Sequence, residues 1–237
     1  MRPRHDWRRA FRAVRRLFVD KEDTAQVFEL MWALNGRAHV GDFARLLASA
    51  DGGRIAYERV ELAERLMDKA WTATFPPGSV GAAYLDFINR HHFTMQGMID
   101  ESHKGVPPAE LDALHPYAWW SRRVRDMHDI WHVLLGYDRD HLGEMCMVAF
   151  SYQETRGPGW ALLMGAGLMR CQGPARRQAR RAILEARRRG KRAAWLPALD
   201  YETLMFEPLE SARARLGLEP PGAYEAVPAA LRDLSVD

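Results

Sequence analysis

Apolar residues recur along most of this chain at the three- and four-residue spacing of an amphipathic helix. Between Thr24 and Asn35 this spacing is kept by Val27, Leu30, Met31 and Leu34. We expect Gly36 to end this helix as a C-terminal cap, because glycine tolerates the left-handed backbone at that position. We expect Asp42 to begin a second helix that runs to Ala50, since an aspartate can accept hydrogen bonds from the first turn.

The same spacing predicts further helices at residues 59–71, 80–90, 117–135, 139–154, 160–171, 175–189 and 195–209. Prolines interrupt residues 94–116, where we expect a loop-rich stretch with one short helix. The strict alternation of apolar and polar positions that marks a half-buried strand is missing. The pattern therefore predicts an all-α fold, a single compact multi-helix domain with antiparallel helix pairs around a metal site.

The composition is consistent with one domain. The chain has 237 residues, of which 47% are hydrophobic, so it can bury a sizeable core. We divide it into a basic amphipathic arm at 1–22, an all-helical, metal-containing domain at 23–218 and an irregular tail rich in proline and alanine at 219–237. Cys146 and Cys171 are its only cysteines, which argues against a disulfide scaffold and fits a reducing compartment.

Nothing in the sequence predicts a membrane-spanning segment or a secretory signal. The apolar run from Gly159 to Met169 is too short to cross a bilayer, and the first residues lack an apolar signal core. We therefore expect a protein that is soluble or that touches a membrane from one side.

Positive charge is concentrated in two arginine clusters. The first comprises Arg8, Arg9, Arg12, Arg15 and Arg16, and the apolar residues Trp7, Phe11, Val14 and Phe18 recur among them at helical spacing. This pattern is typical of an amphipathic helix on an anionic membrane surface. An organellar transit peptide and an ordinary surface helix are the alternatives, although Asp6 and the lack of serines weaken the first.

The second cluster extends from Arg170 to Arg192. Its partners could be lipid headgroups, a phosphorylated ligand, another protein or nucleic acid. We rank nucleic acid last and expect none to bind, because the stretch lacks interleaved aromatic residues and any known nucleic-acid motif.

The candidate chemistry lies in residues 128–144. His128 and His132 are four residues apart and share one helical face, and Asp129 can turn toward the same point. Glu144 follows the turn at residues 136–138, so we expect it on the next, antiparallel helix. Two imidazoles with carboxylates can hold a divalent transition metal, and the donor set fits Zn, Fe or Mn.

The setting of the two acids also favours a metal site. Asp129 and Glu144 are flanked by apolar residues, and a buried carboxylate needs an ionic partner or a metal. The alternative is an internal salt bridge from these acids to Arg122, Arg123 or Arg125.

Two known hydrolase patterns fit poorly. Zinc proteases of the His-Glu-x-x-His type need a glutamate after the first histidine, where this chain has Asp129. The His-Asp phosphohydrolases need a separate upstream histidine and a distal aspartate, a role that His91 and His92 match only weakly.

The complete spacing His128-Asp129-x-x-His132, eleven residues, Glu144 resembles the signature of the ubiquinone (coenzyme Q) biosynthesis protein 4 family. Other segments are similar to that family as well: Gly53–Ile55 with Glu58 and Arg59, Pro77–Gly81 with Tyr84, His128–Gly136, Gly190–Ala193 and Leu199–Glu202. The similarity covers roughly residues 25–218.

This resemblance implies an all-helical metalloprotein that acts on prenylated intermediates of quinone biosynthesis. Members are similar to C1-decarboxylases of prenylated 4-hydroxybenzoates, in a simple or an oxidative version. His128, Asp129, His132 and Glu144 would carry over as the metal ligands. The resemblance also implies peripheral association with membranes and with other enzymes of the pathway. The chain departs from the family at residues 94–116, which leaves the ring substituents open.

Two further assignments concern the substrate. Arg125, one turn before His128, is our candidate to pair with the substrate carboxylate or with a ligand's second oxygen; an ordinary surface arginine is the alternative. For the prenyl tail we expect an apolar groove offered by Trp119, Trp120, Trp131, Met145, Met147, Leu162, Leu163 and Met164, although the same stripe is typical of plain core.

Two functions follow. The first is metal-dependent C1 decarboxylation, and the second is a lipid-binding organiser of a quinone-biosynthesis complex with a structural metal. In both we expect a homo-oligomer that binds polyprenylated aromatic molecules and an anionic membrane surface. It would lie in the cytoplasm on the inner face of the cell membrane, or on the matrix side of the mitochondrial inner membrane.

Overall fold

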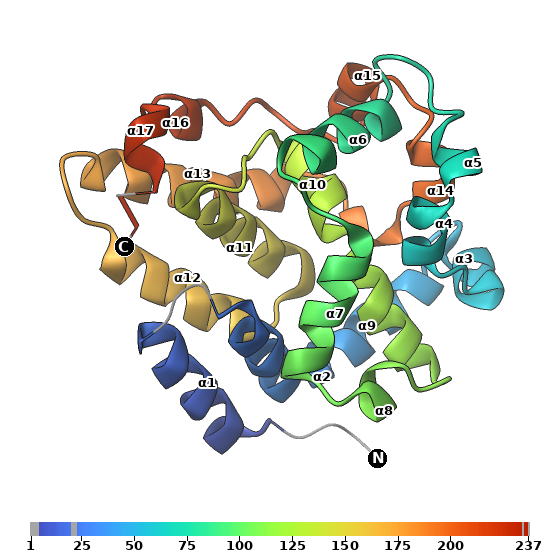
Figure 1. Ribbon diagram of the computed structural model, residues 1–237, viewed down its shortest axis with the longest axis horizontal. Coiled ribbons are helices and arrows are strands. Elements are labelled where there is room, and N and C mark those ends of the chain that lie inside the picture. Colours follow the sequence, from blue (N-terminus) through green and yellow to red (C-terminus); the bar gives the residue numbers. More distant parts are fainter. Residues whose placement is uncertain (1–4, 20–22, 234, 237) are drawn as a thin grey trace.

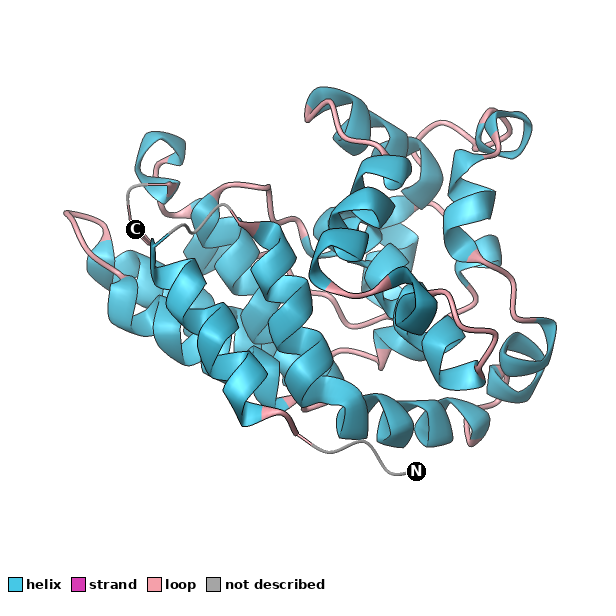
Figure 2. Cartoon of the chain, turned by 60° about the horizontal axis from the view of Figure 1, so that its bottom comes forward, coloured by secondary structure: helices cyan, strands magenta, loops and turns pink. Residues whose placement is uncertain are grey.

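The computed structural model describes residues 5–19, 23–233 and 235–236. Every regular element in these ranges is a helix (Figure 2), which confirms the all-α prediction, and two isolated β-bridges join Ser79 to Pro208 and Cys171 to Val236. The α-helices are α1 (Trp7–Val19), α2 (Thr24–Leu47), α3 (Gly52–Glu58), α4 (Leu62–Met67), α5 (Lys69–Thr72), α6 (Val80–Arg90), α7 (Met95–Gly105), α8 (Pro108–Leu111), α9 (Pro116–Asp126), α10 (His128–Leu135), α11 (His141–Thr155), α12 (Pro158–Arg170), α13 (Arg176–Arg192), α14 (Tyr201–Leu204), α15 (Leu209–Arg215), α16 (Gly222–Glu225) and α17 (Ala229–Arg232), with a 3₁₀ turn at Leu196–Ala198.

The helices form two groups (Figure 1). On one side α11, α12 and α13 pack together, and on the other α10 packs against α6, α9 and α15. Helix α2 connects the two groups, because it contacts α1, α12, α7 and α9. All of α10 after its first residue is buried, from Asp129 to Leu135. The segment with the candidate ligands therefore lies inside the fold.

Helix α2 is longer than the sequence predicted, and the expected break at Gly36 does not occur. Gly36 is not among the glycines with positive φ, and Asp42 is buried within the helix instead of capping a new one. Both halves of α2 are held by packing, since Leu30 and Leu34 on one side of the glycine and Leu46 on the other are fully buried. Tertiary contacts therefore outweigh the local preference of glycine.

Several predicted boundaries also shift. The helix expected at 59–71 divides into α4 and α5, because the Asp68 carboxylate accepts hydrogen bonds from the backbone of Ala70 and Trp71 and so begins a new helix. The helix expected at 117–135 divides at Met127 into α9 and α10. Residues 94–116 are mostly helical as α7 and α8, and the predicted 195–209 helix is replaced by the 3₁₀ turn and α14.

The two ends of the described chain are helical and packed. In α1, Ala10 and Ala13 pack with Leu30, Ala33 and Leu34 of α2. Trp7 and Phe11, expected on the apolar face of the arm, stay 59% and 71% exposed. The 219–237 segment, expected to be irregular, contains α16 and α17 and buries Tyr224 and Val227. The alanines of α1 thus pack against α2, whereas Trp7 and Phe11 point outward.

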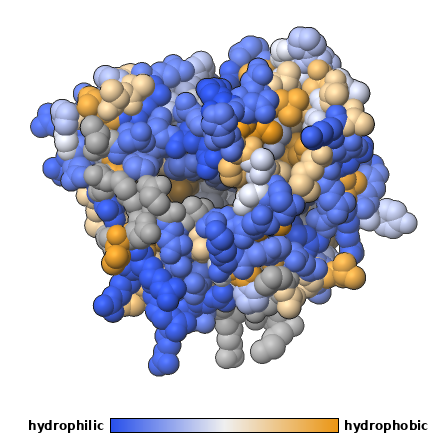
Figure 3. All heavy atoms as spheres, in the orientation of Figure 1, coloured by the Kyte–Doolittle hydropathy of each residue, from blue (hydrophilic) through white to orange (hydrophobic). Residues whose placement is uncertain are grey.

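Within the described ranges, no helix combines the length and the apolarity needed to cross a bilayer. Figure 3 shows one face as mostly hydrophilic, with a hollow over α11 that has apolar atoms at its floor.

Candidate metal centre

Two short structural devices position the candidate ligands. Gly136 has a φ of 75°, a left-handed conformation that glycine adopts without strain, and it ends α10. The Asp140 carboxylate accepts a hydrogen bond from the Gly143 backbone at 2.7 Å and so begins α11. A Cβ at Gly143 would lie 1.9 Å from the carbonyl oxygen of Asp138, so only glycine fits there. Together these devices place Glu144, in the first turn of α11, against the His128 end of α10.

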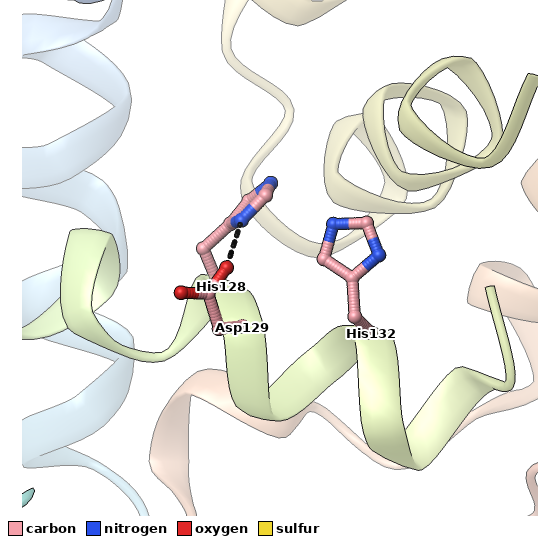
Figure 4. A group of neighbouring side chains, drawn as sticks. All are labelled: His128, Asp129 and His132. Atoms are coloured by element: carbon pink, nitrogen blue, oxygen red, sulfur yellow. Dashed lines mark hydrogen bonds and ion pairs between the residues drawn. The ribbon is translucent and has the colours of Figure 1, made fainter. Parts of the chain in front are cut away.

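The structure brings all four predicted ligands together. His132 Nε2 lies 3.5 Å from Glu144 Oε1, and His128 Nε2 lies 3.8 Å from Glu144 Oε2. The two imidazole rings are 4.8 Å apart, centre to centre (Figure 4). His128, Asp129 and His132 each offer a donor atom, and these atoms lie within 4.8 Å of one another. The candidate centre therefore consists of residues from two helices, α10 and α11.

Hydrogen bonds fix which ring nitrogen of each histidine faces the centre. His132 Nδ1 lies 3.1 Å from the carbonyl oxygen of Tyr137. His128 Nδ1 lies 3.3 Å from Asp129 Oδ1. Both oxygens accept hydrogen bonds, so each Nδ1 carries the proton in the neutral ring and each Nε2 lone pair is available toward Glu144. This is the arrangement by which proteins orient histidine ligands of metals.

Two polar atoms of the centre are buried without a hydrogen-bond partner among the described residues. They are Asp129 Oδ2 and His132 Nε2. Leaving a buried acceptor unpaired costs about 1–3 kcal/mol, and more when it is charged. A cation between the two imidazoles would satisfy His132 Nε2, whereas the free oxygen of Asp129 points away from His132 (Figure 4). The donor set of two imidazoles with carboxylates fits a bound divalent metal.

The centre is open on one side. Asp129 and His132 are buried, whereas the side chains of His128 and Glu144 are 32% and 36% exposed. Burial by itself would raise the pKa of Glu144, but the neighbouring His132, His128 and Arg139 outweigh it and lower that pKa to about 2. Glu144 is therefore a carboxylate across the physiological pH range and is available as a ligand.

The alternative of an internal salt bridge to α9 does not occur. Arg122 pairs with Glu61, and Arg123 pairs with Glu202 through two contacts of 3.0 and 2.9 Å. Arg125 donates to Asp126 at 2.8 Å. All three guanidinium groups have other acids as partners, so the carboxylates of the centre are not neutralised by them.

Arg125 is not placed as expected for a substrate-binding residue. Besides Asp126, its guanidinium donates to Ser102 Oγ at 3.0 Å, and its side chain is buried. Its hydrogen-bonding capacity is directed to α7 and α9, and we do not retain it as a substrate ligand. Sequence spacing alone did not reveal this, because Ser102 lies on another helix.

His91 and His92 do not join the group. His91 Nε2 lies 2.6 Å from Asp138, and the ring of Phe87 is in contact with the rings of both His91 and His132. His92 is exposed, with a φ of 51°. The structure therefore gives no support to the His-Asp phosphohydrolase pattern.

The sequence pattern did not point to two residues at the rim of the centre, Arg139 and Phe93. Arg139 Nε lies 3.7 Å from Glu144 Oε1, and its guanidinium carbon lies 4.5 Å from the centre of the Phe93 ring. An arginine in the eleven-residue interval before Glu144 was the available signal. Phe93 lies between α6 and α7, just before the segment that was expected to be loop-rich, and nothing in its spacing pointed to the centre.

An apolar strip leads away from Glu144 along α11. Met145, Val148 and Tyr152 follow at helical spacing and are all partly exposed, and a hollow lies over this helix in Figure 3. Gly167 of α12 lies beside the strip, since a Cβ there would meet Met145 Cε at 2.2 Å. Of the residues expected to line a groove, Trp119, Trp120, Trp131 and Met147 are buried core instead, whereas Met145, Leu162, Leu163 and Met164 are partly exposed.

The known proteins that this chain resembles share one description, ubiquinone biosynthesis protein. The chain is 29% identical over 178 residues to a mitochondrial ubiquinone biosynthesis protein COQ4 homologue of Rattus norvegicus, and the match covers 72% of this chain and 62% of the relative. It is 28% identical over 184 residues to the corresponding protein of Danio rerio, covering 75% and 63%. The chain thus spans less than two thirds of the length of these curated relatives.

A similar fold is found in a crystal structure of a protein assigned to ubiquinone biosynthesis in Nostoc punctiforme. The TM-score is 0.66 at 20% identity, with 91% of this chain and all of that chain covered. In addition, residues 43–222 match the model of the family described as coenzyme Q (ubiquinone) biosynthesis protein Coq4, and this range contains the whole candidate centre. The chain therefore belongs to the coenzyme Q (ubiquinone) biosynthesis protein Coq4 family.

Proposed function

We propose that this protein works in ubiquinone biosynthesis as a metal-dependent C1-decarboxylase of a prenylated 4-hydroxybenzoate. The observation that carries the proposal is the convergence of two oriented imidazole Nε2 atoms with the Glu144 carboxylate at a partly exposed position. Family membership supplies the pathway, and the geometry supplies a centre at which an aromatic head group can be held.

His128, His132 and Glu144 would hold the metal, with Asp129 as the fourth ligand. Asp129 Oδ1 orients the His128 imidazole, and the unpartnered Oδ2 can donate to the ion once the carboxylate turns toward the centre. When bound, a divalent metal supplies Lewis acidity that polarises and orients a carboxylate or phenolate. The donor set suits Zn, Fe or Mn.

The reaction needs little from the protein beyond orientation and access to protons. In a 4-hydroxybenzoate the phenol oxygen is para to the carboxylate, so the phenolate places electron density on C1. The bond between C1 and the carboxyl carbon breaks, carbon dioxide leaves, and C1 takes up a proton. The partly exposed side of the centre at His128 and Glu144 offers that proton a route from solvent. An oxidative version, which leaves a hydroxyl on C1, would need a redox-active metal and an oxidant.

The apolar strip on α11 fits the prenyl tail. It begins at Met145, next to the ligand Glu144, and continues through Val148 and Tyr152. A head group at the metal centre would thus place its tail along α11, in the hollow seen over that helix. Methionine side chains suit an irregular apolar ligand because they are flexible and polarisable.

The exposed face of α1 favours the second candidate function, a lipid-binding organiser at a membrane. Trp7 and Phe11 point outward from the same helix that carries exposed Arg8, Arg12 and Arg15. Exposed aromatic residues with arginines suit the interface of an anionic bilayer. In α12 only Gly159 and Gly167 are buried, so its apolar side chains are partly exposed too. We propose peripheral docking through these helices, which is compatible with either function.

One complementation experiment tests the decarboxylase and separates it from the organiser. A strain that lacks the gene is rescued with wild type, with Glu144→Ala or with Glu210→Ala, whose glutamate is 81% exposed on α15. Quinone intermediates are then profiled by mass spectrometry after all three proteins are shown to accumulate. We expect carboxylated, prenylated intermediates to be cleared by wild type and Glu210→Ala but not by Glu144→Ala.

The other outcomes point elsewhere. Full rescue by Glu144→Ala would mean that the metal centre is dispensable and would favour the organiser. No change in quinone on deletion would refute the assignment to this pathway.

A further inference from the structure

Arg139 occupies a distinctive position at the rim of the metal centre. It lies in the turn between α10 and α11, with Nε 3.7 Å from Glu144 Oε1. Its guanidinium carbon stacks 4.5 Å from the centre of the Phe93 ring, and its side chain is 34% exposed. The group is therefore held beside the ligands while remaining accessible from solvent.

The hydrogen-bonding capacity of this guanidinium is almost unused. Its contact with Glu144 is longer than a hydrogen bond, and no other described side chain or carbonyl accepts from it. The arginines of α9 differ sharply, because Arg123 makes a two-point contact with Glu202 and Arg125 donates to both Asp126 and Ser102. A guanidinium carries five N–H donors in a planar fork that matches a carboxylate.

The surrounding charges leave Arg139 available to an incoming anion. Asp138, next in sequence, pairs instead with His91 at 2.6 Å and faces Arg90 at 3.9 Å. Among the described residues, Glu144 is the acid that lies within ion-pair distance of the guanidinium, and it is also the carboxylate shared by His128 and His132. A cation bound by Glu144 would neutralise that acid and weaken its hold on Arg139.

We propose that Arg139 is the substrate-carboxylate receptor of this centre, with Phe93 holding its guanidinium flat at the rim. The inference rests on the proposed function in that the acid recognised is the prenylated aromatic carboxylate. Arg139 selects and orients the acid and does not accelerate bond cleavage. The decarboxylated product lacks the group that Arg139 binds, so it is held less tightly and leaves.

The test compares binding of an acid and its methyl ester, which share the ring and the prenyl tail, whereas only the acid carries the carboxylate charge that Arg139 recognises. The probes are 3-geranyl-4-hydroxybenzoate and its methyl ester, titrated calorimetrically into protein loaded with zinc, which is redox-inert. Wild type, Arg139→Gln and Arg139→Lys are compared with the control Arg90→Gln. Arg90 is a good match because it is a nearby exposed arginine that contacts Asp138 and not Glu144. Zinc content is measured for every variant.

We expect wild type to prefer the acid to the ester. Arg139→Gln should weaken acid binding by about 10- to 100-fold, the usual effect of losing a charge-assisted two-point contact. Ester binding and zinc content should stay the same. Arg139→Lys should recover part of the preference, because it restores the charge without the planar fork, and Arg90→Gln should behave as wild type.

Three results would overturn the inference: equal binding of acid and ester by wild type, an equal loss of both in Arg139→Gln, or the same loss of preference in Arg90→Gln. Its failure can be told apart from failure of the decarboxylase proposal. If the preference for the acid depends on Arg139 but the protein releases no carbon dioxide with Zn, Fe or Mn, the role of Arg139 stands and the reaction is refuted. Release of carbon dioxide, together with an unchanged preference of Arg139→Gln for the acid, would leave the reaction standing and refute the role of Arg139.

Discussion

Replacing Asp129 by asparagine should have opposite effects on the metal-free and the metal-bound protein. The new side chain would be isosteric, and its amide oxygen could still accept from His128 Nδ1, as Asp129 Oδ1 does at 3.3 Å. The substitution removes the negative charge and replaces the second oxygen, Oδ2, by the amide nitrogen. In the wild type this oxygen is buried without a partner. The substitution thus removes the charge of the carboxylate and keeps the oxygen that orients the imidazole.

The magnitudes follow from these contacts. Without metal, at a pH above the pKa of His128, which is raised, despite burial, by the hydrogen bond to Asp129, loss of the buried charge on Asp129 should stabilise the fold by about 1–2 kcal/mol. With metal, loss of one ligand should weaken affinity by at least the 10- to 100-fold that is typical for residues supporting a metal site, or about 1.4–3 kcal/mol. Zinc should therefore raise the melting temperature of the variant much less than that of wild type.

The assay is thermal unfolding of both proteins with a chelator and with excess zinc, together with zinc titration against a competing chelator. Asp126→Asn serves as the control, because Asp126 is equally buried but is paired with Arg125 and with the backbone of Ala63. That variant should lose stability by about 3 kcal/mol with and without zinc, since it breaks a buried ion pair. If Asp129→Asn binds zinc as wild type does, or if the chelated variant is less stable than wild type, the assignment of Asp129 as a ligand is refuted.

Three other predictions concern different parts of the molecule. Burial raises the pKa of Glu154 to about 8, and the nearby charge of Asp42 adds to this effect. Because the folded-state pKa lies above the ordinary value of 4.5, protonated Glu154 contributes its full stability below pH 4.5. This contribution is lost as the pH rises through 8. Wild type should lose roughly 4 kcal/mol more than Glu154→Gln in urea unfolding between pH 5 and 9, and equal losses would contradict this. Gly167→Leu should displace Met145, which a Cβ at this position already meets at 2.2 Å, and weaken binding of a geranyl probe at unchanged zinc content; unchanged probe affinity would remove the strip from the tail site. Phe11→Ser should reduce co-sedimentation with anionic vesicles several-fold without lowering stability, because this side chain is 71% exposed, and a drop in melting temperature would show instead that Phe11 is part of the fold.

The sequence by itself determined the helical class and predicted the four residues that meet at the candidate centre. Helical periodicity is a local property, so the pattern of Val27, Leu30 and Leu34 was sufficient to predict a helix there. The spacing of His128, Asp129 and His132 placed three donors on one turn, since helix geometry is nearly invariant. Glu144 could be associated with them because α10 ends at Gly136 and α11 begins after Asp140, so the residues between them form a compact turn.

Only the tertiary structure decided what each of these residues contacts. Gly36 does not end α2, because burial of Leu34 and Leu46 on its two sides outweighs the preference of one glycine. Arg125 is engaged by Ser102, which comes from a different helix, and Arg139 emerges as the accessible guanidinium only once Phe93 and Glu144 lie beside it. Helix propensity and spacing act within a few residues, whereas burial and ion pairing depend on segments that meet only when the chain folds.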